Sequence, residues 1–227
     1  MIGDTARYEH DGEKGVVAIK LPVSEAQKFA VAVLGAFSKG ECAAMIADTE
    51  AKGYEHAKLN LGNGIELLDT NIRKSQRCIV ESVEQANFIW ERIKDHVPST
   101  WKHAGKTWKV SGLNERLRFL RYDAGDFFIA HEDSSFQRSD RERSFVTVLI
   151  HLSEGFQGGA TSFSEATGSG KELHAARAGQ TLLFQHDIFH AGEPIEAGVK
   201  YAMRSDVMYA LADDDAAAAA SAAAKLS

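Results

Sequence analysis

The stretch Tyr122-Asp-Ala-Gly-Asp-Phe-Phe-Ile-Ala-His131-Glu-Asp133 places a histidine and an aspartate two residues apart in a run that we expect to be a β-strand. Alternate side chains of a strand point to the same face, so His131 and Asp133 should lie together while Glu132 points away. A later stretch, His190-Ala-Gly-Glu-Pro-Ile-Glu-Ala-Gly-Val-Lys200, places another histidine ten residues before a lysine. The two stretches predict one site built from distant parts of the chain.

The segment around these stretches has the pattern of many short strands. Strand-like runs are separated by glycine-rich or polar breaks such as Gly158-Gly159 and Gly168-Ser-Gly170. We expect strands at 116–122, 127–133, 144–152, 160–163, 172–176, 180–185, around 190 and at 200–209. About eight short strands with such turns are typical of a jelly roll, the double-stranded β-helix of the cupins.

The preceding part of the chain has helix signals. Ser38 with Glu41, and Ser82 with a glutamine three residues later, are capping boxes that open helices. The run 29–37 is apolar and ambiguous between helix and strand, and Ala104-Gly105 predicts a hairpin turn. We therefore expect one structural domain, mainly β with α, in three segments: an N-terminal helical and strand layer at 1–112 packed on the core, the jelly-roll core at 113–210, and an Ala-rich tail at 211–227.

Composition excludes several classes of protein. The 227 residues are 44% hydrophobic and 26% charged, which is ordinary for a globular protein. The net charge of -6 argues against a nucleic-acid partner, and no apolar run is long enough to span a membrane. Two cysteines give no disulfide framework and suit a reducing compartment, so we expect a cytoplasmic protein. The polar N-terminal stretch is unlike a signal peptide.

The residue types at the expected site indicate a metal. Two histidines and one carboxylate, with coordination positions left open, form the facial triad of non-haem Fe(II) oxygenases. His131, Asp133 and His190 are the candidate ligands. His186 is an alternative to His190, but it lacks the following Gly-x-Pro and the ten-residue spacing to Lys200.

An ordered set of further motifs carries a resemblance to a known family. From roughly Leu113 to Tyr209, the chain resembles the catalytic domain of prolyl 4-hydroxylase-like Fe(II)/2-oxoglutarate dioxygenases. The matching motifs are Arg121-Tyr122-x-x-Gly125, His131-x-Asp133, Arg143-x-x-x-Thr147, Gly158-Gly-x-Thr161-x-Phe163, Ala178-Gly-x-x-Leu-Leu-Phe184 and His190-x-Gly-x-Pro194-x-x-x-Gly198-x-Lys200. The resemblance implies iron at the triad, 2-oxoglutarate anchored by Lys200, and Tyr122 and Thr147 beside this cosubstrate. It implies Fe(II), 2-oxoglutarate and O2 as cofactors, with ascorbate as a further candidate.

Two residues depart from the family pattern or extend it. His151 stands where many relatives carry a tyrosine that touches the far carboxylate of 2-oxoglutarate, and it can donate a hydrogen bond there; the alternative is a core histidine. Arg204 shares a strand face with Lys200, Ala202 and Asp206. Arg204 therefore either pairs with Asp206 or lies near the iron and orients cosubstrate or substrate.

Three function classes follow from these features. The first is a hydroxylase that couples decarboxylation of 2-oxoglutarate to C–H hydroxylation of a peptidyl or small-molecule substrate. The second is a cupin-type metal enzyme that does not use 2-oxoglutarate, and Lys200 argues against it. The third is a binding module without activity, and the intact triad argues against that.

Overall fold

The structure is a computed structural model that describes residues 14–60 and 65–212. The helices are α1 (Lys39–Lys52) and α2 (Val83–Ile93), with short 3-10 turns η1 (Val23–Glu25) and η2 (Lys94–His96). The strands of the N-terminal half are β1 (Gly15–Ala18), β2 (Ala30–Leu34), β3 (Glu55–His56), β4 (Leu59–Asn60), β5 (Glu66–Leu67), β6 (Arg73–Lys74), β7 (Gln76–Glu81), β8 (Thr100–His103) and β9 (Lys106–Leu113). The remaining strands are β10 (Arg116–Tyr122), β11 (Phe127–His131), β12 (Gln137–Ser139), β13 (Glu142–His151), β14 (Gln157–Gly158), β15 (Thr161–Phe163), β16 (Glu172–His174), β17 (Thr181–Gln185), β18 (His190–Gly192), β19 (Ile195–Ala197) and β20 (Lys200–Leu211).

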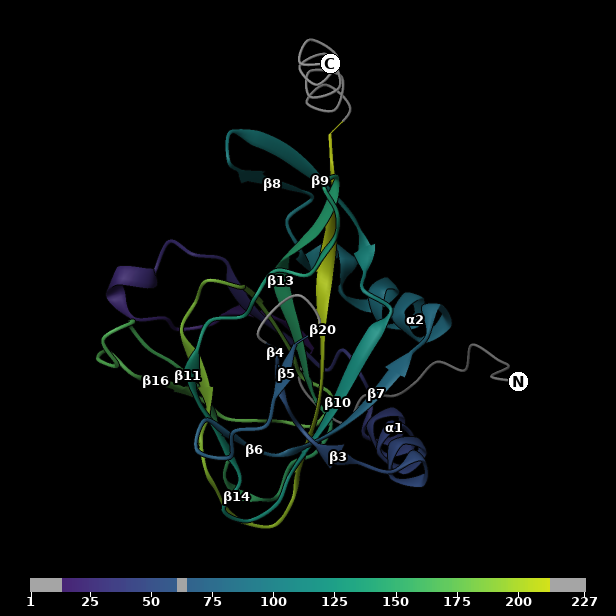
Figure 1. Ribbon diagram of the computed structural model, residues 1–227, viewed down its shortest axis with the longest axis vertical. Helices are drawn as coiled ribbons and strands as arrows, with labels where there is room; N and C mark the ends of the chain where they lie inside the picture. Colours follow the sequence, from purple (N-terminus) through teal and green to yellow (C-terminus); the bar gives the residue numbers. More distant parts are fainter. Residues whose placement is uncertain (1–13, 61–64, 213–227) are drawn as a thin grey trace.

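Two antiparallel sheets organise the described part of the chain. The larger has eleven strands, with the order β1-β2-β17-β13-β20-β10-β7-β3; in addition β12 pairs with β13, β9 with β20, and β8 with β9. The smaller has the order β16-β15-β18-β11-β6. Figure 1 shows the two helices on one side of the large sheet and β11 and β16 on the other. Strands that are distant in sequence are neighbours in both sheets, so the expected jelly-roll core with added helices is confirmed.

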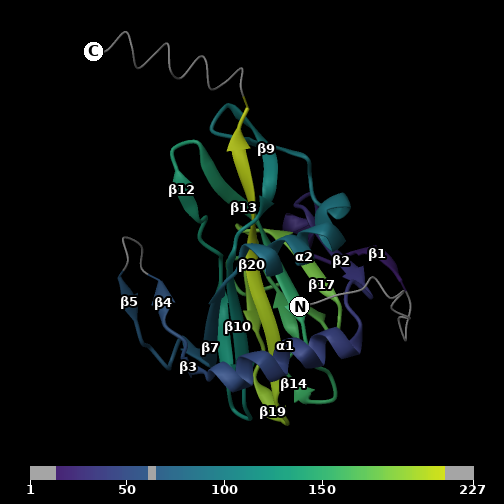
Figure 2. The ribbon, with the colours of Figure 1, turned by 90° about the vertical axis from the view of Figure 1, so that its right-hand side faces the viewer.

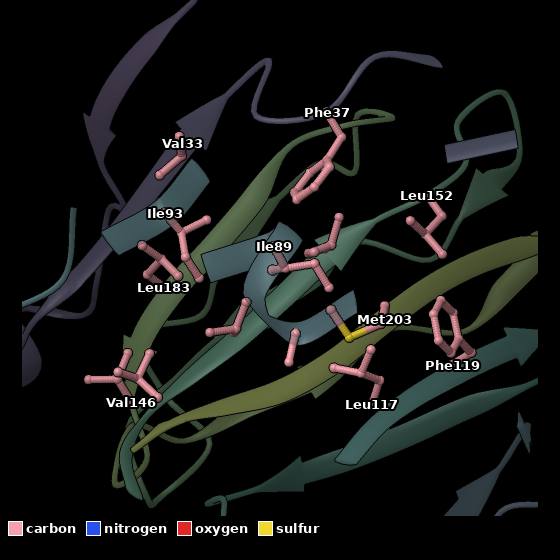
Figure 3. Packing of buried hydrophobic residues seen from close by; sticks show 14 of the residues in the cluster. Val33, Phe37, Ile89, Ile93, Leu117, Phe119, Val146, Leu152, Leu183 and Met203 are labelled. Atoms are coloured by element: carbon pink, nitrogen blue, oxygen red, sulfur yellow. The ribbon is translucent and has the colours of Figure 1, made fainter. Parts of the chain in front are cut away.

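The helices cover one face of the large sheet because successive side chains of its strands point alternately to the two faces, and those on the helix side are apolar. Val146, Val148 and Ile150 of β13 are fully buried in the main apolar cluster with Ile89 and Ile93 of α2. Figure 3 shows several members of this cluster between the helix and the strands. The intervening residues of β13 are turned toward the opposite face, where the small sheet lies. Alternation along the central strands therefore separates the structural core from a second, partly polar interior.

Local sequence signals account for the helix boundaries. The capping box of α1 is present: the Ser38 hydroxyl accepts from the Glu41 amide at 3.2 Å, and the Glu41 carboxylate accepts from the Ser38 amide at 2.8 Å. The helix ends before Gly53, whose φ of 88° favours glycine. Figure 2 shows α1 lying across the strands of the large sheet. The turn at Ala104-Gly105 joins β8 to β9 with positive φ at both residues, which confirms the predicted hairpin.

The first 112 residues contribute to the sheet as well as to the helical layer. The ambiguous run 29–37 contains β2, which pairs with β17, and β7 pairs with β10. We therefore propose that the expected segments at 1–112 and 113–210 form a single structural domain. Of the expected tail at 211–227, Leu211 still belongs to β20 and Ala212 is buried, whereas 213–227 lie outside the described residues. Within the described ranges, no helix is both long and apolar enough to cross a membrane.

Candidate functional site

Three predicted site residues come together between the two sheets. His131 ends β11, His190 begins β18, and the two residues are direct partners in that strand pair. Asp133 lies two residues beyond β11, so the observed strand ends earlier than the predicted strand 127–133. The Asp133 amide instead donates to the carbonyl of His186 at 2.9 Å. One ligand atom from each of His131, Asp133 and His190 lies within 4.8 Å of the others.

Both histidines are held in the orientation that a metal ligand needs. Nδ1 of His131 donates to the carbonyl of Ile129, and Nδ1 of His190 donates to the carbonyl of Ile188, each at 2.9 Å. A carbonyl oxygen can only accept, so each Nδ1 carries the proton and each Nε2 keeps its lone pair. The Nε2 atoms lie 3.7 Å (His131) and 3.6 Å (His190) from the carboxylate of Asp133. Burial lowers the pKa of His190 to about 4, which keeps that ring neutral near pH 7.

The carboxylate between them is held from two other sides. Thr147 of β13 donates its hydroxyl to Oδ2 of Asp133 at 2.6 Å, and Nη2 of Arg204 lies 3.1 Å from Oδ1. Burial by itself raises the pKa of Asp133, but the neighbouring charge of Arg204, the largest opposing cause, helps to hold the pKa well below its usual range. Asp133 is therefore an ionised, oriented carboxylate. Two imidazoles on neighbouring strands and one carboxylate just beyond β11 fit an Fe(II) ion with open coordination positions.

The alternative histidine has a different place. Nδ1 of His186 lies 2.9 Å from the hydroxyl of Thr147, and Nε2 lies 2.7 Å from the hydroxyl of Ser144. Both ring nitrogens are thus occupied by hydroxyl groups, and the three-residue cluster contains His190. His186 supports Thr147, which in turn bonds Asp133.

A cavity lies beside the cluster. All three cluster residues line it, together with Tyr122, Thr147, Lys200 and Arg204 among others. Lys200 is only 4% exposed, its ammonium donates to the carbonyl of Gly159 at 2.6 Å, and it lies 5.7 Å from the Tyr122 ring centroid. Burial lowers the pKa of Lys200 to about 8. A buried ammonium that faces a cavity fits a carboxylate ligand, because an ion pair would offset its desolvation.

His151 is fully buried near Lys200 but does not line this cavity. Neither ring nitrogen has a hydrogen-bond partner among the described residues. Burial, and then the charge of Lys200, lowers the pKa of His151 well below its usual value, so the ring is neutral. Its predicted contact with the far carboxylate of a cosubstrate stays a prediction.

Arg204 combines the two arrangements expected of it. Its Nη2 lies 3.0 Å from Oδ1 of Asp206 and 3.1 Å from Asp133, so it pairs along its own strand and also contacts the cluster. Asp206 is 1% exposed and also accepts from Arg118, the residue opposite Arg204 in the β10–β20 pair, at 3.0 Å.

Sequence reasoning missed two participants. Arg118 could have been found from its place on the strand that precedes Tyr122, with which it shares a face. Arg73 was visible only as part of a short basic cluster, because the pairing of β6 with β11 brings it to the cavity.

Comparisons with known proteins agree with this geometry. Residues 117–205 match the model of the 2OG-Fe(II) oxygenase superfamily. No curated protein matches the chain in sequence. Similar solved structures include the viral collagen prolyl hydroxylase of Paramecium Bursaria Chlorella virus-1 in its 2OG complex, with TM-score 0.54, 18% identity, and 81% of this chain and 97% of that one covered.

Two cellular proteins show the same likeness. A prolyl-4-hydroxylase of Pseudomonas putida has TM-score 0.56 and 16% identity, with 81% and 94% of the two chains covered. A prolyl hydroxylase of Trichoplax adhaerens, solved with a peptide fragment of the hypoxia inducible factor oxygen degradation domain, has TM-score 0.59 and 15% identity, with 86% and 88% covered. At these identities, the likeness concerns the fold.

The matched segment contains the whole cluster and the cavity cations Lys200 and Arg204. The expected enzyme class and its cofactors, Fe(II), 2-oxoglutarate and O2, are thereby confirmed. Residues 117–205 are thus similar to the 2OG-Fe(II) oxygenase superfamily, and the fold is similar to that of the prolyl 4-hydroxylases.

Proposed function

We propose that this dioxygenase is a hydroxylase in which His131, Asp133 and His190 hold Fe(II) and Lys200 anchors the far carboxylate of 2-oxoglutarate. The observation that carries the proposal is that the three ligand atoms, all within 4.8 Å of one another, face the same cavity as the buried ammonium of Lys200. When bound, iron and 2-oxoglutarate supply the oxidation with O2, giving succinate, CO2 and a hydroxylated C–H position.

The chain's own residues prepare the site for this chemistry. The carbonyls of Ile129 and Ile188 fix the protons of the two histidines on Nδ1, so both can coordinate without first losing a proton. Thr147 and Arg204 hold the two oxygens of Asp133 in place and keep it ionised. We infer that this support lowers the reorganisation needed when the metal binds.

The end of the cavity that contains Lys200 orients the cosubstrate. Lys200 starts β20 directly opposite Tyr122 of β10, so an anion bound to Lys200 would lie against the Tyr122 ring. Leu149 and Ala202 also line the cavity and offer apolar surface to the chain of the bound cosubstrate. A cupin-type enzyme without 2-oxoglutarate would have no ligand for the buried ammonium of Lys200. A module without activity would not need two oriented histidines beside an ionised carboxylate.

The substrate is peptidyl or a small molecule in this proposal. The peptide complex of the Trichoplax prolyl hydroxylase supports a peptide, because the folds are similar over most of both chains. We further propose that the protein works in the reducing cytoplasm, since Cys42 and Cys78 are both free and buried.

Metal content tests the ligand assignment. We expect one Fe(II) per chain by elemental analysis, lost or greatly weakened in His131→Ala, Asp133→Ala and His190→Ala. His186→Ala is the matched control, because it removes a buried histidine four residues from His190 and should leave the metal bound. A His190→Ala protein that keeps iron, beside a His186→Ala protein that loses it, would reverse the assignment.

The cosubstrate is tested on the anaerobic protein. Adding 2-oxoglutarate to the Fe(II) form should produce a weak visible charge-transfer band, and admitting O2 should release succinate slowly without substrate. A protein with bound iron but with neither a band nor a thermal shift from 2-oxoglutarate would favour the cupin-type alternative.

A further inference from the structure

The cavity contains more positive charge than iron and 2-oxoglutarate require. Among the residues that line it, Arg73, Lys200 and Arg204 are cations, and Asp133 is the one carboxylate. Iron(II) and the 2-oxoglutarate dianion cancel each other, so the loaded cavity would still hold two positive charges. Behind it, Asp206 is already paired with Arg118. Cations that are partly removed from water are costly when their charge is not balanced, and Arg73 and Arg204 are both half-buried, so the cavity favours a further anion.

Arg73 is the clearest case. Its Nε donates to the hydroxyl of Ser75 at 3.0 Å, and its guanidinium lies 4.7 Å from the centre of the Phe128 ring. Within the described residues, no carboxylate lies within ion-pair distance of it. Burial lowers the pKa of Arg73; Tyr122, which is also its hydrogen-bond partner, raises this pKa, and the nearby charge of Arg204 lowers it. The two guanidinium groups thus lie near one another, and only Arg204 has carboxylate partners among the described residues.

Arg204 also has unused donor capacity. Its Nη2 is held by Asp133 and Asp206, but its Nε is buried and has no hydrogen-bond partner in the part of the chain that the structure describes. A guanidinium presents its donors as a planar fork that matches a carboxylate. The fork of Arg204 is therefore only partly satisfied by its own chain.

The two arginines lie beside the metal cluster, away from the cosubstrate anchor. The Phe128 ring that Arg73 covers is stacked on His131, with centroids 3.6 Å apart. Arg204 contacts Asp133 of the same cluster. Lys200 lies four residues before Arg204 on β20, which corresponds to roughly 13 Å along a strand. An anion between Arg73 and Arg204 is thus a different group from the far carboxylate of 2-oxoglutarate.

We propose that Arg73 and Arg204 bind a carboxylate of the substrate beside the iron, and that the substrate is therefore a carboxylic acid. This inference rests on the proposed hydroxylase function and narrows its substrate class. A free amino acid and the C-terminal residue of a peptide both carry such a carboxylate. In either source, binding of the carboxylate would fix the position of the neighbouring substrate carbon relative to the iron.

The test measures binding in the absence of O2, so that no turnover occurs. The protein loaded with Fe(II) and 2-oxoglutarate is titrated calorimetrically with the standard free amino acids, each beside its α-carboxamide, and with prolyl tripeptides whose C-terminus is free or amidated. We expect at least one acid to bind, and its amide to bind more weakly by about tenfold or more, the scale of one lost charge-assisted hydrogen bond. The free amino acids and the tripeptides distinguish the two sources.

Variants then assign the effect to the arginine. Arg73→Met should weaken binding of that acid by about tenfold or more and leave 2-oxoglutarate affinity within about twofold. Arg73→Lys keeps the charge and should recover part of the loss. Arg177→Met removes an exposed arginine away from the cavity and should change neither affinity. Circular dichroism confirms the fold of each variant.

Three results would overturn the inference: acids and amides that bind alike, no acid that binds to protein loaded with 2-oxoglutarate, or an Arg73→Met protein whose 2-oxoglutarate affinity falls. Failure of the proposed function would give a different result: the wild-type protein would bind no iron or no 2-oxoglutarate before any acid is added.

Discussion

Replacing Lys200 by methionine should stabilise the unloaded protein and at the same time abolish cosubstrate binding. The ammonium of Lys200 is 4% exposed, and burial lowers its pKa from 10.5 to about 8. A lysine whose pKa is lower in the folded than in the unfolded state destabilises the fold wherever it is charged in both. That cost is complete below about pH 8 and disappears as the pH approaches 10.5.

The size of the effect follows from the pKa difference. At about 1.4 kcal/mol per unit, the shift corresponds to about 3 kcal/mol at pH 7. Methionine also removes the donor to the Gly159 carbonyl, which costs about 1 kcal/mol. Lys200→Met should therefore stabilise the metal-free protein by about 2 kcal/mol, or about 6 °C in Tm for a domain of this size.

Urea unfolding and thermal melting at pH 7 measure the first effect, and anaerobic titration with 2-oxoglutarate measures the second. The stabilisation should shrink when the same melts are run near pH 10. A Lys200→Met protein that is less stable than wild type at pH 7, or that binds 2-oxoglutarate normally, would refute the assignment of this buried ammonium as a cosubstrate anchor kept at the expense of stability.

Three further predictions concern the same framework. Because only charged Lys200 binds a carboxylate, 2-oxoglutarate affinity of the wild type should fall above about pH 8 by up to about tenfold per pH unit, and Lys200→Met should lack this dependence. Thr147→Val removes the hydroxyl that Asp133 accepts from and should weaken Fe(II) binding by about 10- to 100-fold in a competitive chelator titration, with an unchanged far-UV spectrum; normal iron affinity would show that the hydroxyl is dispensable. Gly179→Ala should cost about 3 kcal/mol or more in urea unfolding, because φ is +81° and the added Cβ would lie 1.9 Å from the Phe37 carbonyl oxygen; a cost below about 1 kcal/mol would mean that the loop moves freely.

The sequence by itself determined the features that depend on local spacing. Capping residues fixed the start of α1, and the two-residue hairpin turn between β8 and β9 follows from Ala104-Gly105. The short strand-like runs with glycine-rich breaks were enough to predict the jelly roll, and the motifs around His131 and His190 were enough to predict the metal cluster. Alternation along β20 was enough to predict that Lys200 and Arg204 share a face, because side-chain direction in a strand has a period of two.

Only the tertiary structure decided the features that depend on strand pairing between distant segments. The run 29–37 became a strand because β17 was available to pair with it. The sequence favoured His190 over His186, but the geometric reason is the register of β18 against β11, which puts His190 opposite His131; His186 lies between two hydroxyl groups. Arg73 reaches the cavity because β6 pairs with β11 at Phe128. Such contacts join residues far apart in the chain, and no local period or propensity encodes which strands become neighbours.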